Sequence, residues 1–374
     1  MHDVWRALSF SFGMTWEILW ALILGFGLSA VVQALVSKRR LQKLLGDDSA
    51  KTVAVATALG AASSSCSYAA VALARALFRK GASFTAAMAF EIASTNLVVE
   101  LGIVMGLLLG WQFVVGEFVG GPLIIVFVAL LFRLFLKQRL VDEARAEADK
   151  RHVGSMEGHA GMDMSAPRLL TAEGYTATAD YFVMDWAAVW RDVFGGLLIA
   201  GALAAWVPDS FWRSLFLEHH GTLGKVWGPL IGPAVATLSF VCSIGNVPLA
   251  AVLWNGGISF GGVIAFVFGD LLILPILNIY RRYYGWKMAG VVFVTFYAAM
   301  AVSGVVVEYL FTGAGIERHA RNAKVEMAHV TWNYTTYLNI VFLAIGVMLV
   351  WRYFRRGGGW RMLKMMEEPM GVTG

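Results

Sequence analysis

The chain contains one segment twice, and the two copies lie 176 positions apart. Between residues 66 and 101, 12 of the 36 aligned pairs are identical without a gap. The pairs that are hardest to match by chance are Cys66 with Cys242, Gly81 with Gly257 and Ser83 with Ser259. The alternative is chance similarity between two segments rich in Ala, Leu, Val and Phe. We interpret the match as an internal duplication, which is typical of secondary transporters.

Long apolar runs place the chain in the membrane class. Hydrophobic residues make up 58% of the sequence and charged residues 15%, with a mean hydropathy of +0.66. This composition excludes an ordinary soluble domain. A helical span takes about 20 apolar residues, and runs of that length recur along the chain. The first run, residues 15–36, is full length, so we interpret it as a retained span and not as a signal peptide.

Each copy contains an apolar run that polar residues interrupt. In the first copy, residues 63–67 separate the half-length runs 52–62 and 68–78. In the second copy, residues 242–246 interrupt the run 226–257. Irregular backbone survives at membrane depth only where protein or a water-filled cavity satisfies its polar groups. We therefore predict one re-entrant helical hairpin in each copy.

A broken span is predicted to follow each hairpin. The first covers residues 82–110 with its interruption at 94–96, and the second covers residues 259–280. Five further spans are expected at residues 15–36, 122–136, 186–206, 288–311 and 334–351. The fold prediction is therefore an all-α polytopic membrane protein with about seven spans, two hairpins and two inverted repeats.

The distribution of basic residues supports the inverted arrangement. Of the 30 basic residues, 21 fall in segments assigned to the cytoplasm, 6 in segments assigned outside and 3 within spans, as the positive-inside rule requires. This orientation predicts a multi-pass protein of the plasma (inner) membrane with its N-terminus outside and its C-terminus in the cytoplasm. The alternative treats each hairpin as a full span and gives nine spans with parallel repeats.

Four parts follow from these assignments. Residues 1–136 form the first membrane repeat, 137–181 a cytoplasmic loop, 182–311 the second membrane repeat, and 312–374 an outer loop, the last span and a basic cytoplasmic tail. The cytoplasmic loop starts as a charged helix and is expected to be solvated and partly disordered. It contains a set of soft-ligand side chains: His152, Met156, His159, Met162 and Met164.

This His and Met set could bind copper or another soft ion. Its spacing matches no zinc pattern, and flexible loops also collect Met and His without a binding role. Both readings stay open at this point.

Cys66 and Cys242 are the only cysteines, and each is followed by Ser at the break of a hairpin. Thiolates prefer soft metals and metalloids, although a membrane cysteine is often a small hydrophobic residue. Half-helix N-termini present unpaired N–H groups, so polar residues near the breaks are candidates for a substrate cradle. The candidate substrate-binding residues are Cys66, Cys242, Ser65, Ser67, Ser243, Asn246, Thr95 and Asn96.

Glu91 and Asp270 are acidic residues inside predicted spans. Inserting a charged residue at the centre of a membrane helix costs about 2.5–3.5 kcal/mol. We therefore interpret both as candidate proton-coupling carboxylates. The alternative is an ion pair, with Arg75 as the partner of Glu91 or Glu100.

Several classes of function are disfavoured. The sequence contains no G-x-x-x-x-G-K-[ST] phosphate loop, so nucleotide hydrolysis by that route is excluded. The sequence pI near 9.2 is explained by basic residues beside spans, and we expect no nucleic-acid partner and no cofactor. An intramembrane thiol redox enzyme would need Cys66 and Cys242 with Cα atoms within about 7 Å. A channel or scaffold subunit is the third alternative, and the sequence leaves a homo-oligomer open.

Residues 65–90 and 242–276, which carry the repeated Cys-Ser break and the Gly-x-Ser turn, resemble the predicted permeases grouped with ArsP and YraQ. Characterised members export trivalent organoarsenicals, so the resemblance implies efflux of a small thiophilic solute, with Cys66 and Cys242 at the matching positions. Two prolines expected from this pattern are absent in the first copy, at 68–72 and 94–96, whereas the second copy has Pro248 and Pro275. The prediction is an exporting secondary permease and not an enzyme, with the lipid bilayer and a soft metal, metalloid or other small molecule as partners.

Overall fold

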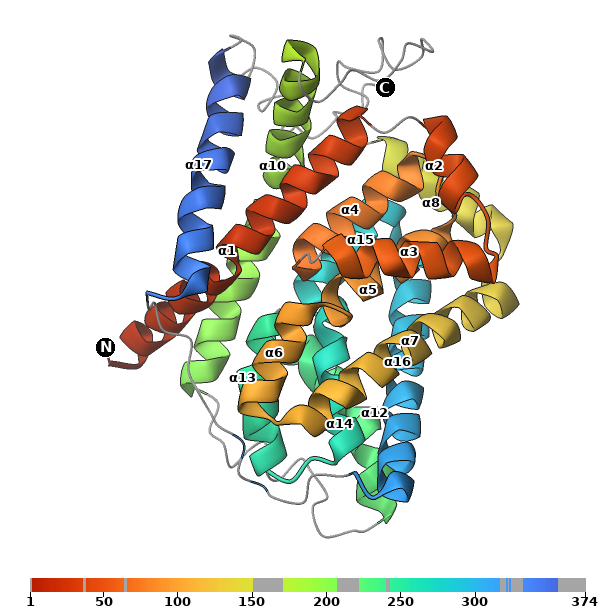
Figure 1. The fold of residues 1–374 in the computed structure, drawn as a ribbon, viewed down its shortest axis with the longest axis vertical. Helices are drawn as coiled ribbons and strands as arrows, with labels where there is room; N and C mark the ends of the chain where they lie inside the picture. The colour runs from red at the N-terminus through yellow and green to blue at the C-terminus, as the bar shows by residue number, and fades with distance from the viewer. Residues whose placement is uncertain are drawn as a thin grey trace, which may run out of the picture.

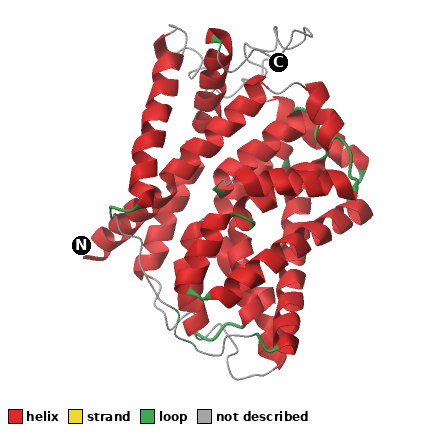
Figure 2. Ribbon diagram, viewed as in Figure 1, coloured by secondary structure: helices red, strands yellow, loops and turns green. Residues whose placement is uncertain are grey.

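The computed structural model describes residues 2–35, 38–63, 66–150, 171–206, 222–239, 243–316, 321, 323 and 332–355. Every regular element in this part of the chain is a helix (Figure 2), which confirms the predicted all-α class. The first half contains α1 (His2–Leu35), α2 (Lys38–Leu45), α3 (Ala50–Ser63), α4 (Ser67–Arg79), α5 (Phe84–Asn96), α6 (Val99–Leu108) and α7 (Trp111–Phe135).

The second half follows after α8 (Gln138–Lys150). It contains α10 (Ala172–Trp206), α12 (Thr222–Ser239), α13 (Ser243–Asn255), α14 (Phe260–Phe268), the 3-10 helix η1 (Gly269–Leu272), α15 (Leu274–Tyr284), α16 (Trp286–Ala314) and α17 (Tyr334–Arg355). Helix α10 begins at Ala172, before the expected end of the cytoplasmic loop at residue 181.

Helix boundaries repeat between the halves at the spacing found in the sequence. Helix α13 begins and ends 176 residues after α4, and α3 and α12 both end at serines with that spacing. The segment formed by α14 and η1 spans the same interval after α5. Both halves thus contain two consecutive helices, followed by a bent helix pair.

Three helices are long and apolar enough to cross a membrane by length and composition: α7, α16 and α17. The pairs α5 with α6 and α14 with α15 pass the same test together and bend by 41° and 44°. Helices α1 and α10 have 34 and 35 residues, which corresponds to about 50 Å at 1.5 Å per residue. The structure thus contains several helices of membrane-spanning length.

Two predicted breaks lie slightly elsewhere. The first broken helix was expected to be interrupted at residues 94–96, but α5 continues through Asn96 and the break falls at Leu97 and Val98. Residues 243–246 were expected in the second hairpin break, but they form the first turn of α13. In both places the polar residues extend the helix, because backbone hydrogen bonds within a helix satisfy buried amides at no further cost.

The turn after α4 and the turn after α13 have the same local chemistry. Gly81 and Gly257 have φ angles of 106° and 101°, which favour glycine because it lacks a Cβ. Two residues later, the side chains of Ser83 and Ser259 accept hydrogen bonds from the backbone N–H groups of Ala86 and Gly262. These serines are N-caps, and they start α5 and α14 at equivalent positions.

An arginine holds each of these turns from outside. The Arg145 guanidinium on α8 donates to the carbonyls of Phe78 and Ala82 and lies 4.1 Å from the centre of the Phe78 ring. Arg321 donates to the carbonyls of Trp254 and Ile258 and lies 3.9 Å from the centre of the Trp254 ring.

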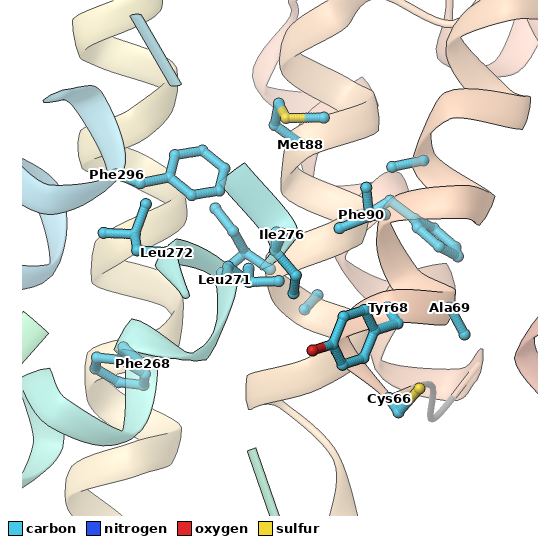
Figure 3. Packing of buried hydrophobic residues seen from close by; sticks show 14 of the residues in the cluster. Cys66, Tyr68, Ala69, Met88, Phe90, Phe268, Leu271, Leu272, Ile276 and Phe296 are labelled. Carbon is cyan, nitrogen blue, oxygen red and sulfur yellow. The ribbon is translucent and has the colours of Figure 1, made fainter. Parts of the chain in front are cut away.

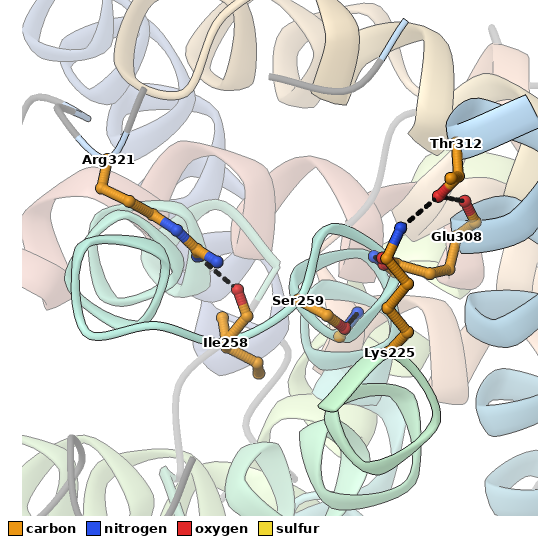
Figure 4. A network of polar contacts seen from close by, with 8 residues as sticks. Lys225, Ile258, Ser259, Glu308, Thr312 and Arg321 are labelled. Carbon is orange, nitrogen blue, oxygen red and sulfur yellow. Dashed lines mark hydrogen bonds and ion pairs between the residues drawn. The ribbon is translucent and has the colours of Figure 1, made fainter. Parts of the chain in front are cut away.

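Figure 4 shows Arg321 reaching Ile258. Each of the three residues in the first arginine contact lies 176 positions before its counterpart in the second contact. The duplication therefore extends beyond the aligned segment. We call these two contacts the arginine clamps.

Equivalent long helices pack side by side in opposite directions. Helix α1 lies beside α10 (Figure 1). Phe26 packs against Trp186, and the Ser29 hydroxyl donates to Asp185. For α7 and α16, Phe113 near the start of α7 contacts Phe260, which in turn contacts Phe311 near the end of α16. The two helices of each equivalent pair are therefore antiparallel.

Segments assigned to the cytoplasm gather at one end of the molecule. Arg145 on α8 binds the turn after α4, Lys287 at the start of α16 contacts Glu143 on α8, and Ser83 N–H donates to the Leu45 carbonyl. The turn after α13 lies in another cluster, with Lys225, Thr312 and Arg321 (Figure 4).

Helix α8 is docked on this end and is not a solvated helix as expected. Ala144 and Ala148 on α8 are fully buried, and the helix packs on α4, α15 and α16. The Arg75 and Arg145 side chains both donate to backbone carbonyls across this interface. The sequence pattern missed the docking because the alanines that form the buried face carry little hydrophobic signal among the charges of α8.

Candidate substrate site

One carboxylate joins the two halves of the molecule. The Ser67 hydroxyl and the Ser243 hydroxyl both donate to Oδ2 of Asp270, each at 2.5 Å. The two serine oxygens are themselves 3.3 Å apart. Ser67 and Ser243 are equivalent residues of the two copies, so the halves meet at this point, and Asp270 is completely buried there.

The elements that carry these residues favour a negative charge. Ser67 is the first residue of α4 and Ser243 is the first residue of α13, so two helix N-termini converge on Asp270. Helix N-termini carry unpaired N–H groups and a partial positive charge, and they stabilise anions. Asp270 itself lies in η1, where the α14–α15 pair bends. Its second oxygen, Oδ1, has no hydrogen-bond partner and is available to a ligand or proton.

Glu91 lies on α5 and is also completely buried. The Tyr280 hydroxyl on α15 donates to Oε1 of Glu91, and Oε2 has no hydrogen-bond partner. The negative charges of Glu91 and Asp270 repel each other. Both predicted coupling carboxylates therefore lie in the same interior region, on the two bent helix pairs.

Arg75 does not form the ion pair that was the alternative role for Glu91. Its guanidinium donates to the carbonyl of Ala148 on α8 and lies 4.1 Å from the centre of the Tyr283 ring. The Glu100 side chain lies outside the described residues. In the described part of the chain, Glu91 thus has a neutral phenol as its hydrogen-bond partner, and its charge is not paired.

Cys66 is the N-cap residue of α4, next to Ser67. Its side chain is buried at the edge of the hydrophobic cluster that contains Tyr68 and Ala69 (Figure 3). The thiol is therefore one residue away from the serine that binds Asp270. Cys242 and Ser65, the other predicted residues of the two breaks, lie outside the described residues.

The remaining predicted cradle residues divide into two groups. Thr95 is buried, but its hydroxyl bonds to the carbonyls of Glu91 and Ile92 in its own helix, which is the ordinary role of Thr in a helix. Asn96 is fully buried, and neither atom of its amide has a hydrogen-bond partner. Asn246 is also fully buried, with Oδ1 accepting from Ser239 at 3.4 Å and Nδ2 unpartnered. The two asparagines keep polar atoms available, whereas Thr95 does not.

Sequence reasoning also missed Glu117 on α7, a buried carboxyl group without a hydrogen-bond partner. It is fully buried, and neither carboxyl oxygen has a hydrogen-bond partner. A signal was present: Glu117 lies in an apolar run among Gly116, Gly120 and Gly121. An acidic residue on the small-residue face of a membrane helix faces a neighbouring helix, and such residues are commonly functional.

The predicted soft-ligand set at His152, Met156, His159, Met162 and Met164 lies outside the described residues. Within the described ranges, no group of three or more His, Cys, Asp and Glu side chains could hold a metal ion. The polar groups that converge at the centre are hydroxyls and a carboxylate from separate helices. Such a set can bind a proton or a hydrogen-bonding solute.

The helices and the buried polar centre define a polytopic membrane protein of the permease type. A family model described as "Predicted permease" (ArsP_1) matches residues 4–309, which include both copies of the repeat. The chain therefore belongs to this predicted permease family.

A relative from Mycobacterium tuberculosis, named "Putative permease Rv2963", is 62% identical over 338 residues. The match covers 88% of this chain and 83% of the relative. The family and this relative support a transporter in preference to an enzyme. No solved structure matches the chain.

Proposed function

We propose that the chain is a secondary permease in which two inverted repeats alternate around the site formed by Ser67, Asp270 and Ser243. The observation that carries this proposal is the meeting of equivalent serines on one buried carboxylate. Antiparallel packing of α1 with α10 and of α7 with α16 supports the inversion. In transporters of this kind, rocking of one repeat against the other exposes a fixed central site to each side in turn.

The proposed architecture has seven spans and two re-entrant hairpins. The hairpins are α3 with α4 and α12 with α13, and the bent pairs α5–α6 and α14–α15 each count as one span. The N-terminus is then outside and the C-terminus is in the cytoplasm of the plasma membrane. The common location of the clamped turn after α4, α8 and the start of α16 supports this orientation.

The proposed substrate is a small thiophilic solute, such as a trivalent organoarsenical, which the permease exports. Cys66 supports this class because a soft thiol lies beside Ser67 at the N-terminus of α4. Membership of the permease family supports transport, and its resemblance to organoarsenical exporters favours this cargo. Cys242 occupies the equivalent place in the second copy of the sequence.

Asp270 and Glu91 are the proposed coupling carboxylates. Each has one carboxyl oxygen in a hydrogen bond and one without a partner. Charged groups at membrane depth cost several kcal/mol unless they are paired. Proton binding at these oxygens would therefore couple the conformation of the bent helix pairs to the proton gradient.

Counterflow in proteoliposomes tests the proposal. Vesicles that contain the full chain are loaded with an unlabelled trivalent methylarsenical, and the entry of the same compound at tracer concentration is measured by arsenic mass spectrometry. A carrier accumulates the tracer transiently, because it exchanges one molecule for another, whereas a channel or scaffold subunit does not. Absence of counterflow with arsenicals, antimonials, mercurials and copper would contradict the proposed transport of soft solutes.

A further inference from the structure

We propose that Glu117 is a further coupling carboxyl group, beside Asp270 and Glu91, and that it holds its proton as a neutral carboxylic acid in the state that this structure represents. This inference rests on the proposed secondary transport and adds a residue that sequence reasoning did not identify. It starts from the different surroundings of the three buried carboxyl groups at the centre.

Asp270 is surrounded by groups that stabilise its anion. Two hydroxyls donate to one of its oxygens, and the N-termini of α4 and α13 converge on it. Such donors favour the charged form of a buried carboxyl group and oppose the effect of burial. Glu91 receives a single donor, the Tyr280 hydroxyl.

Glu117 receives no donor. Both of its oxygens are buried without a hydrogen-bond partner. Burying an unpaired carboxylate costs far more free energy than burying a neutral carboxylic acid, because a charge loses more on leaving water than a neutral polar group does. At this place Glu117 therefore favours its protonated form.

The elements packed against α7 supply no cation to Glu117. The charged residues of α5 and α16, in the described part of the chain, have other contacts: Glu91 accepts from Tyr280, Lys287 contacts Glu143, and Glu308 lies 3.8 Å from Lys225. Helix α6 also packs on α7, and the side chain of its Glu100 lies outside the described residues. Helix α14 contains no titratable residue, and η1 adds Asp270, whose negative charge repels a charge on Glu117.

The position of Glu117 connects it to the central site. Gly116 and Gly120, on the same helix, lie directly against Phe260, Ile264 and Phe268 of α14. Helix α14 leads into η1, so Phe268 is two residues from Asp270. A shift of η1 that accompanies substrate release would change the surroundings of Glu117 as well.

The proposed step is a proton transfer to water. When the site opens to one side and water reaches α7, the O–H bond of Glu117 breaks, the proton leaves with water as hydronium, and the carboxylate remains. Return to the closed arrangement requires the carboxylate to take a proton from water on the side then open. The charge of Asp270, which repels the Glu117 carboxylate, favours this uptake.

The first test needs no substrate. Infrared difference spectra of the reconstituted full chain, taken between wild type and Glu117→Gln at neutral pH, should contain the carbonyl band of a protonated carboxyl group. Glu308→Gln is the matched control, because Glu308 is buried on an adjacent helix but ion-paired and accepts from Gly261 N–H. Its difference spectrum should lack that band. The same spectrum for both variants would overturn the assignment.

The second test separates exchange from net transport with the trivalent methylarsenical as probe. Gln mimics the neutral acid, so Glu117→Gln should keep counterflow within about twofold, because exchange does not require release of the coupled proton. Accumulation driven by a pH gradient should fall at least about tenfold. Equal loss of both activities, or normal gradient-driven accumulation, would overturn the inference. Absence of counterflow in wild type would instead contradict the proposed function.

Discussion

Two regions of the molecule differ in how far their residues repeat between the halves. We call the arginine clamps and the capped turns the frame, and we call the site around Ser67, Ser243 and Asp270 the centre. In the frame, Arg145 and Arg321 clamp equivalent turns, and Ser83 and Ser259 cap equivalent helices. At the centre, the carboxylates occur once. Asp270 corresponds to Ser94, and Glu91 corresponds to Val267.

Glu117 is likewise a carboxyl group that has no acidic counterpart in the other half. Helices α7 and α16 start at Trp111 and Trp286, each after a glycine with positive φ. This alignment places Val292 opposite Glu117. In the proposed mechanism, the duplicated frame provides two similar halves that move against each other, whereas the single set of acidic groups binds protons and substrate.

The largest effect is expected at the residue that breaks the symmetry most strongly. Asp270→Asn removes the charge that two hydroxyls and two helix N-termini stabilise. Hydrogen bonds to charged groups contribute about 1.5–3 kcal/mol each, so transport should fall at least about a hundredfold. Counterflow rates, normalised to the amount of protein in the vesicles, measure this change. Transport near the wild-type rate would remove Asp270 from the site.

Moving the carboxylate to the other half sharpens the same comparison. The double variant Ser94→Asp with Asp270→Ser places the acid at the equivalent position of the first copy. If the frame is functionally symmetric, this variant should recover part of the counterflow that Asp270→Ser alone loses. No recovery in a well-folded double variant would limit the symmetry to the frame.

The two serines at the centre should be equal partners. Ser67→Ala and Ser243→Ala each remove one hydroxyl donor to Asp270, at a cost of about 1.5 kcal/mol or about a tenfold fall in counterflow. Ser94→Ala is the matched control, because the Ser94 hydroxyl donates to the Glu91 carbonyl in its own helix. A large effect of one serine variant and none of the other would contradict a site shared by both halves.

The arginine clamps test the frame. Arg145→Ala and Arg321→Ala each remove two hydrogen bonds to carbonyls and a ring contact, so each should lower the free energy of unfolding by about 1–3 kcal/mol. Thermal unfolding in detergent measures both. Arg139→Ala is the control, because Arg139 is exposed and pairs with Glu143 on the surface of α8. A loss of stability in only one of the two clamp variants would show that the clamps are not equivalent.

The smallest effect is expected at the surface of α8. The Glu143 pKa lies below its ordinary value, because Lys287 donates to it and attracts its charge, with a smaller contribution from Arg139. This contribution to stability is present above the pKa of Glu143 in the unfolded chain and is lost as pH falls through the lower, folded value. Lys287→Ala should therefore have a slightly lower unfolding temperature than wild type at neutral pH, and the difference should vanish in acid. A difference in unfolding temperature that persists in acid would indicate that Lys287 stabilises the fold through packing and not through its charge.

Repetition and hydropathy predicted much of the fold. Gly81 and Ser83 have counterparts at one constant spacing, so their local structures were predictable in pairs. Ser67 and Ser243 were predicted as polar residues at the helix breaks. Their contact with Asp270 was not predicted, because it joins residues 203 positions apart in the sequence.

Other features lacked a local signal. The partner of Glu91 is Tyr280, which a hydropathy pattern treats as an apolar residue at the end of a span. Arg145 looked like one of many charges on a solvated helix, although its contacts are backbone carbonyls. Glu117 was hidden by its apolar neighbours. These features depend on which helices pack together, which a single sequence does not encode in its periodicity.

The inverted arrangement of the halves is the central claim, and the sidedness of equivalent positions tests it most directly. Gln138 and Ala314 are exposed residues near the ends of the equivalent helices α7 and α16. Each can be replaced by Cys in a chain with Cys66→Ser and Cys242→Ser, and labelled with a membrane-impermeant thiol reagent in intact cells and in inside-out vesicles. The account predicts that the cysteine at 138 labels only in inside-out vesicles and the cysteine at 314 only in intact cells. Labelling of both from the same side would contradict it.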